Sequence, residues 1–185
     1  MEAKTDATLN GWDLDAFRET VATVESNPEA GIVTWRGRVS WDGHFGLDAR
    51  TEAIEQLGQV IPRRFTLRGD HPPELLGENT GPTAVETLLA ALGSCIAGTY
   101  AAHATAQGVR LDALEVSVES AIDLNGFLQL APTNAGLEGV RVAVRVSSDA
   151  DEATLEAIRE IVTKASPVHD SVARPITIES SVERV

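Results

Sequence analysis

The stretch that decides the fold is Gly81–Gln107, with the sequence GPTAVETLLAALGSCIAGTYAAHATAQ. It consists mostly of Ala, Leu, Gly and Ser, contains no Lys or Arg, and has Glu86 as its only acid. Pro82 or Thr83 is a suitable first residue for a helix and Gly108 a suitable end. Small residues occur on more than one face, so we predict a long helix that other elements approach closely. Cys95, the only cysteine of the chain, lies within it.

The same composition also fits a membrane span, because Glu86 is the only charge between Ala84 and Ala102. We predict a buried helix instead, since Ala and Gly contribute little transfer free energy and the segment lies between strand-like segments. The first ten residues lack the apolar core of a signal peptide. We therefore expect a cytoplasmic protein with no membrane partner.

The bulk composition excludes several classes of function. The 185 residues suffice for one domain with a proper core. The net charge of −13 argues against a nucleic-acid partner, which needs clustered Lys and Arg. A single cysteine excludes an internal disulfide and a cysteine-based metal cluster, and no histidine pair has metal-ligand spacing. We expect no metal and no cofactor.

The segments before the central stretch predict a helix followed by three strands. The helix is capped by Asn10 or Asp13. The first strand buries the face that carries Val39 and Trp41, and Asp42-Gly43 is a hairpin turn signal. The predicted ranges are 10–26 for the helix, 32–41, 44–53 and 63–69 for the strands, and 71–82 for a proline- and glycine-rich loop.

The segments after it predict two strands, a helix and a last strand. Asp149 or Asp151 caps the helix, and Ser166-Pro167 stops it. The predicted ranges are 111–124, 137–147, about 152–164 and 174–185. Strands in hairpins favour an α+β fold with an antiparallel sheet. We divide the chain into an N-terminal helical extension, residues 1–30, and a main domain, residues 31–185.

Two motifs resemble those of the OsmC/Ohr family. The run Pro82–Cys95, PTAVETLLAALGSC, is similar to the family's central-helix signature. The run Ser166–Asp170, SPVHD, falls where the family has a second motif, often Cys-Pro-Val. The segment Asp123–Phe127 also fits the family's general pattern. The resemblance covers residues 32 to the C-terminus.

The resemblance implies an intertwined homodimer whose subunits supply strands to two sheets wrapped around paired central helices. It also implies thiol-dependent reduction of organic hydroperoxides in oxidative or osmotic stress defence. In that chemistry the helix cysteine becomes a sulfenic acid, and the second-motif cysteine then closes a disulfide. Here the second position is Ser166, which cannot form a disulfide, so an external thiol must reduce the sulfenic acid.

The resemblance also suggests roles for three residues. Cys95 is either a small core residue or the peroxidatic thiol, which needs a nearby cation to favour its thiolate. Family members use a glutamate and an arginine to orient the thiol and the peroxide. The resemblance therefore makes Glu86 and Arg38 the candidates for these two roles. Glu86 lies about 180° around the helix from Cys95 at roughly 100° per residue, so capping the helix is its alternative role. Arg38, like Arg36, is otherwise an exposed strand residue.

Two histidines complete the candidate site. His103 lies eight residues after Cys95 and approaches the other subunit's thiol only across a dimer axis; its alternative is a partly exposed position near the helix end. His169 follows Ser166 and is expected to face the same pocket. Two hypotheses remain: a one-cysteine hydroperoxide reductase that uses an external thiol, and a non-catalytic dimer that binds a small apolar ligand at its interface. The sequence leaves open whether the protein is an enzyme.

Overall fold

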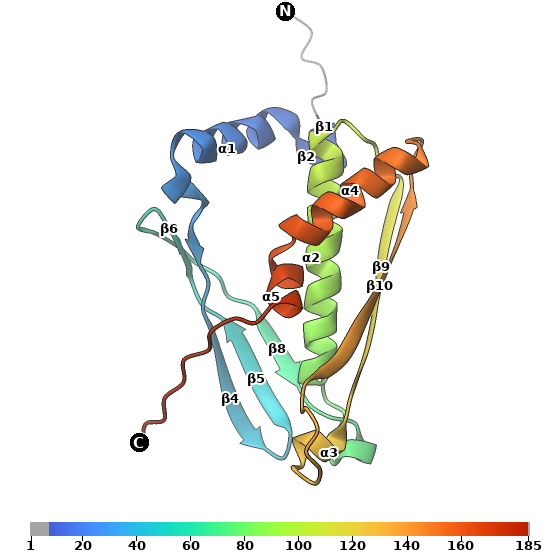
Figure 1. The fold of residues 1–185 in the computed structure, drawn as a ribbon. Helices are drawn as coiled ribbons and strands as arrows, with labels where there is room; N and C mark the ends of the chain where they lie inside the picture. The colour runs from blue at the N-terminus through green and yellow to red at the C-terminus, as the bar shows by residue number, and fades with distance from the viewer. Residues whose placement is uncertain (1–7, 185) are drawn as a thin grey trace, which may run out of the picture. The chain divides into compact units, whose positions relative to one another are not determined.

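The computed structural model describes residues 8–184 and has an α+β fold with antiparallel sheets and a long central helix, α2 (Ala84–Ala106) (Figure 1). The chain divides into two compact units at Leu88/Leu89, so the boundary falls in the first turns of α2. Each unit is described by itself below.

The first unit begins with a small hairpin that the sequence analysis missed. Strands β1 (Thr8–Leu9) and β2 (Trp12–Asp13) pair across Asn10-Gly11, whose φ angles of 52° and 83° suit a tight hairpin turn. Helix α1 (Leu14–Ser26) therefore starts four residues later than predicted. Asp13 caps it by accepting hydrogen bonds from two backbone N–H groups, and the 3₁₀ turn η1 (Pro28–Gly31) follows.

Two antiparallel sheets follow in this unit. The predicted hairpin and third strand are confirmed as a sheet in the order β4-β5-β8. The turn lies at His44-Phe45, two residues after the predicted Asp42-Gly43 signal, because Gly43 pairs with Gly46. A second sheet, in the order β3-β6-β7, contains a hairpin that was not predicted. The strands are β3 (Val33–Thr34), β4 (Gly37–Gly43), β5 (Gly46–Thr51), β6 (Ile54–Gln56), β7 (Gln59–Ile61) and β8 (Thr66–Gly69).

The prediction of one strand with a buried face over residues 32–41 is wrong. The backbone leaves the ladder at Trp35-Arg36, so β3 and β4 belong to different sheets. Val39 and Trp41 are 61% and 72% exposed. Alternation indicates which side chains share a face of a strand, and on this face Val39 and Trp41 are exposed among residues 8–184.

The predicted loop 71–82 is confirmed, with a short 3₁₀ turn, η2 (Pro73–Leu75), inside it. The loop is tied to the buried carboxylate of Asp70, which accepts hydrogen bonds from the backbone N–H groups of His71, Glu78 and Thr80 and from the Thr80 hydroxyl. These hydrogen bonds tie the loop to the residue that directly follows β8.

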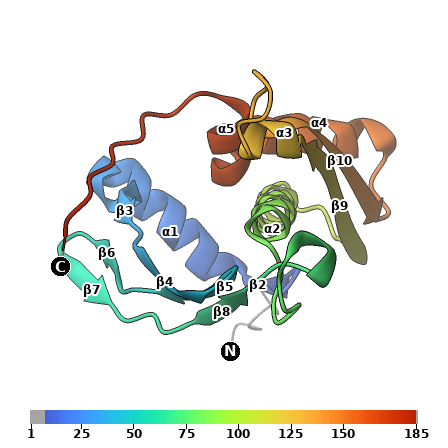
Figure 2. The same cartoon turned by 90° about the horizontal axis from the view of Figure 1, so that it is seen from below.

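The second unit packs two strands and two helices around the rest of α2 (Figure 2). Strands β9 (Ala113–Ile122) and β10 (Leu137–Ser147) are antiparallel and flank a single helical turn, α3 (Leu124–Phe127). Helix α4 (Glu152–Ala165) is capped by Asp151, one of the two predicted caps. A short helix, α5 (Pro167–Ala173), was not predicted. The buried core consists of Leu92, Ile96, Tyr100, Ala104, Ile158 and Val162.

Helix α2 is the one described helix that is long and apolar enough to cross a membrane by length and composition. Its buried side chains pack against α4 and against partly buried valines of β9 and β10. Tyr100 also donates a hydrogen bond to the Leu155 carbonyl of α4 (2.9 Å). These contacts make it a core helix rather than a membrane span.

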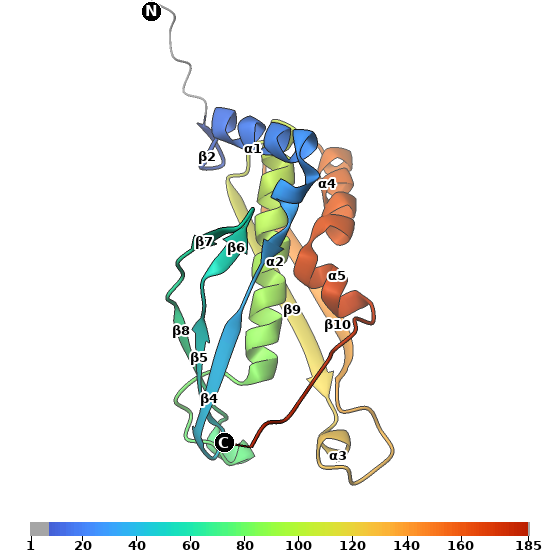
Figure 3. The same cartoon turned by 90° about the vertical axis from the view of Figure 1, so that its left-hand side faces the viewer.

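The predicted last strand is wrong over the described residues 174–184, which form no regular structure (Figure 3). Their apolar side chains are exposed, with Ile178 at 82% and Val182 at 98%. A strand exists only where another strand supplies backbone hydrogen bonds, and the described part of this chain supplies none to this segment. Residues 1–7 of the expected extension and Val185 lie outside the described residues.

Candidate active site around Cys95

The sulfur of Cys95 is held by the segment that follows α4. Cys95 lies on α2 and is partly exposed. Its Sγ accepts a hydrogen bond from the Ser166 hydroxyl (3.2 Å) and one from the backbone N–H of Val168 (3.5 Å). The structure thus brings together Cys95 and Ser166, two residues that lie 71 positions apart in the sequence.

Local backbone rules place these donors. Ser166 ends α4, where its N–H bonds the Val162 carbonyl, and Pro167 then begins α5. The first N–H groups of a helix have no partner within the helix, so the N–H of Val168 is free to donate to the sulfur. Ser166 is fully buried, so its hydroxyl is held against the sulfur.

The two histidines differ in their relation to this site. His169 lies one helical turn after Ser166, and its Nδ1 is buried without a hydrogen-bond partner among the described residues. His103 lies on α2 itself, about 12 Å along the helix from Cys95 at 1.5 Å per residue. Within one chain the shared helix thus keeps His103 away from the sulfur.

The carboxylate of Glu86 is engaged at the start of α2. It accepts a hydrogen bond from the Thr83 N–H (2.7 Å), and the Thr83 hydroxyl accepts one from the Glu86 N–H (3.1 Å). This reciprocal pair is a capping box. The hydrogen bond from the Thr83 backbone is the main reason that the pKa of Glu86 lies below its usual value. The geometry is that of the capping role considered for Glu86 from the sequence.

Arg38 lies on β4 in the first unit, where its Nε donates to Glu52 (3.0 Å). Arg36 makes a similar exposed pair with Glu55 (3.2 Å). Exposed pairs of this kind contribute little stability, so either guanidinium can exchange its partner readily. The two hydrogen bonds to the Cys95 sulfur both come from uncharged groups.

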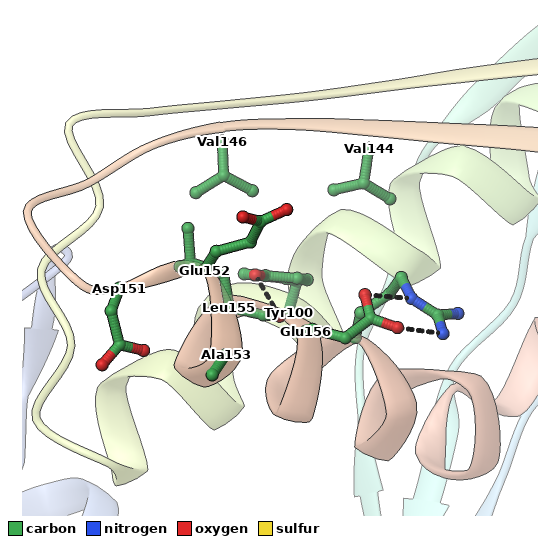
Figure 4. Close-up of a pocket in the computed structure, with 9 residues that line it drawn as sticks. Tyr100, Val144, Val146, Asp151, Glu152, Ala153, Leu155 and Glu156 are labelled. Carbon is green, nitrogen blue, oxygen red and sulfur yellow. Dashed lines mark hydrogen bonds and ion pairs between the residues drawn. The ribbon is translucent and has the colours of Figure 1, made fainter.

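A separate cleft of about 850 Å³ lies in the second unit, between β10 and the first turns of α4 (Figure 4). Val144 and Val146 face Glu152 and Glu156 of α4 across it. Glu156 also forms an ion pair with Arg159. Cys95 is not one of its lining residues. Among residues 8–184, no three His, Cys, Asp or Glu side chains form a group suited to holding a metal ion.

Sequence reasoning did not find Val168 as a contact of the sulfur, because the contact uses its backbone rather than its side chain. A usable signal was present. Pro167 directly after a helix stop is a favoured first residue of a new helix, and such a helix start offers free N–H groups. Ser166-Pro167 could have been interpreted both as the end of one helix and as the start of the next. That interpretation would have indicated free backbone N–H groups near Val168.

Comparison with known proteins agrees with the fold. A search of curated sequences finds no match. An OsmC-like protein of Mycoplasma pneumoniae aligns with a TM-score of 0.60 at 17% identity, over 76% of this chain and 87% of that one. An organic hydroperoxide resistance protein OsmC of Legionella pneumophila aligns with a TM-score of 0.56 at 16% identity, over 75% and 88%. The family model described as OsmC-like protein matches residues 77–181, more than half of the sequence, and the chain belongs to this family.

Proposed function

We propose that the protein is a thiol-dependent organic hydroperoxide reductase with Cys95 as its peroxidatic thiol. The observation that carries the proposal is the environment of the sulfur: two donors from the Ser166–Val168 segment hold it, and the residue stays partly exposed. The two donors hold the sulfur in place, and the thiolate is the nucleophilic form in the proposed reaction. The hydroperoxide resistance protein of Legionella pneumophila, a structural relative, supports the same assignment.

The reaction follows from the single sulfur. The thiolate attacks one peroxide oxygen, the O–O bond breaks, and the products are a Cys95 sulfenic acid and an alcohol. Ser166 cannot close a disulfide, so a first external thiol condenses with the sulfenic acid, releasing water and forming a mixed disulfide. A second thiol then frees Cys95 and leaves as the external disulfide. The apolar side chains of α2 favour organic hydroperoxides over hydrogen peroxide.

In this proposal, polar residues assist the attack of the thiolate on the peroxide. Arg38 approaches the peroxide and favours the thiolate, while Glu86 orients the arginine or remains the cap of α2. Ser166 and His169 line the substrate pocket, and His103 approaches it from the other subunit. The acting unit in this proposal is a cytoplasmic homodimer. Exposed apolar strand residues such as Val39 and Trp41 support it, since a second copy would cover them.

The test is turnover of cumene hydroperoxide with dithiothreitol as the reductant. We expect consumption by the wild type, none by Cys95→Ser, and slower consumption of hydrogen peroxide. Arg38→Ala is expected to lower kcat/KM. Arg36→Ala is its matched control, because Arg36 lies just before β4 and makes a similar exposed ion pair. Equal activity of the wild type and Cys95→Ser would contradict the proposal.

One observation favours a second candidate, a non-catalytic protein that binds a small apolar ligand at a dimer interface. The groups that hydrogen-bond the Cys95 sulfur are all uncharged in the described residues, so no cation contacts it there. A binding protein tolerates Cys95→Ala. Retained affinity for a fluorescent apolar probe in that variant, together with no peroxide consumption by the wild type, would select this candidate.

A further inference from the structure

We propose that oxidised Cys95 closes a covalent sulfur–nitrogen bond to the backbone nitrogen of Val168. The resulting cyclic sulfenamide takes the place of the disulfide that Ser166 cannot form. The inference rests on the proposed function, because a hydroperoxide must first convert Cys95 to its sulfenic acid.

The chemistry of the sulfenic acid limits its partners. Sulfenic acids condense with a thiol, giving a disulfide, or with a backbone nitrogen, giving a sulfenamide. This chain has no second thiol. The backbone nitrogen of Val168 lies 3.5 Å from the sulfur and already directs its N–H at it. Since the first turn of α5 leaves that N–H without a helical partner, no helix hydrogen bond is lost when the nitrogen reacts.

Displacement at sulfur requires that the oxygen and the attacking nitrogen lie on opposite sides of the sulfur. Ser166 is fully buried, whereas Cys95 and Val168 are both partly exposed. The proposal requires that the hydroperoxide leave its oxygen on the side of the sulfur opposite the Val168 nitrogen. The new S–O bond then points away from the attacking nitrogen, which is the arrangement that an in-line displacement at sulfur needs.

The step balances without a further reagent. The nitrogen of Val168 attacks the sulfur, the S–O bond breaks, and the departing hydroxide takes the amide proton and leaves as water. An external thiol reverses the step by attacking the sulfur, so that the S–N bond breaks, the nitrogen regains a proton and a mixed disulfide forms. A second thiol restores Cys95. While closed, the ring keeps the sulfur from further oxidation to the irreversible sulfinic acid.

The experiment is mass spectrometry of the full-length protein after one equivalent of cumene hydroperoxide. We expect the monomer to lose two hydrogen atoms, the peptide with Cys95 to be joined to the peptide with Val168, and dithiothreitol to restore the starting mass. Because the chain has one cysteine, this loss within a monomer cannot be a disulfide. Disulfide-linked dimers separate on a non-reducing gel.

The matched control replaces the Val168 amide by an ester, which removes the nitrogen and keeps the side chain. We expect this variant to gain one oxygen at Cys95 and to be trapped by dimedone, with no joined peptides. A wild type that dimedone traps completely, without joined peptides, overturns the sulfenamide and leaves the proposed function standing. No oxidation of Cys95 in the wild type overturns both. The same loss of hydrogen in the ester variant also overturns the sulfenamide.

Discussion

Ser166 shows how one atom can change the role of a motif position. Its hydroxyl donates to the Cys95 sulfur at 3.2 Å, from a site with no exposure. A hydroxyl there cannot form a disulfide, but it does hold the sulfur by a hydrogen bond. In the proposed reductase, Ser166 therefore keeps its contact with Cys95, and an external thiol must reduce the sulfenic acid.

The first prediction removes this hydroxyl. Ser166→Ala is expected to slow alkylation of Cys95 by iodoacetamide at pH 7 by about tenfold, because a hydrogen bond to a charged group contributes roughly 1.5–3 kcal/mol. Ser171→Ala is the matched control, since Ser171 lies on the same short helix and its hydroxyl bonds the Pro167 carbonyl instead. Equal rates for the wild type and Ser166→Ala would show that the contact does not activate the thiol.

Asp70 is the other residue whose environment makes a sharp prediction. Hydrogen bonds from Thr80, first from its backbone N–H and then from its hydroxyl, hold the pKa of the Asp70 carboxyl well below its usual range, aided by His71 and Glu78. A carboxyl with a depressed folded-state pKa stabilises the fold above its unfolded pKa, about 3.9. That stability is lost as the pH falls from this value toward the folded-state pKa.

The second prediction is that the difference in urea midpoint between the wild type and Asp70→Asn depends on pH. Asp70→Asn places an amide NH₂ against donors and should lower the urea midpoint at pH 7, where the wild-type carboxylate is fully ionised. The gap between the wild type and the variant should narrow as the pH is lowered below about 3.9. Urea titrations at pH 7, 4 and 2.5 measure it. If the difference in urea midpoint is the same at all three pH values, the charge of Asp70 does not stabilise the loop over residues 71–82.

At the scale of elements, α4 illustrates how one helix face holds the second unit together. Ile158 is fully buried against α2, whereas Ile161 on the same helix is 37% exposed. The third prediction compares the two: Ile158→Ala should cost about 3 kcal/mol of unfolding free energy, in the usual range for a buried large-to-small change. Ile161→Ala should cost clearly less. Urea denaturation followed by circular dichroism measures both, and equal losses would contradict the described core.

The helices and strands that were predicted well are those whose limits depend on residues close by in the sequence. The caps Asp13 and Asp151, the end of α2 at Gly108 and the alternation of β9 and β10 all depend on neighbouring residues. The misses have two causes. Turn signals such as Asn10-Gly11 were read as part of a helix, and the strand expected over residues 174–185 needs a partner strand that a sequence does not identify.

The candidate site, like the fold, could be predicted only in part from the sequence. The pairing of Cys95 with Ser166 was expected from the resemblance of two motifs, and the structure places the two side chains in contact. The donor from Val168 was missed, because a backbone group leaves no trace in the side-chain pattern. Arg38 has a described partner in Glu52, and its part in the site remains a prediction.

At the scale of the whole molecule, one exposed apolar face of the β4-β5-β8 sheet is suited to contact a second copy of the chain. Val39, Trp41 and Leu67 lie on one face of the β4-β5-β8 sheet, because the register pairs Val39 and Leu67 with the same residue, Ala49. All three are exposed in the single chain. A strongly acidic protein would repel its copies through its charge, so an exposed apolar face is the surface on which a second copy gains most.

The last prediction tests this face. Sedimentation velocity of the wild type should give about twice the chain mass of 19.7 kDa, and Trp41→Lys should shift the population toward one chain, because it places a charge in the proposed contact. Leu76→Lys is the control: Leu76 is 79% exposed but lies at the end of a loop turn, outside the sheet face. If Leu76→Lys dissociates the protein as strongly as Trp41→Lys, the sheet face is not the contact. A wild type that sediments as one chain would exclude the homodimer, and the His103 role that depends on it.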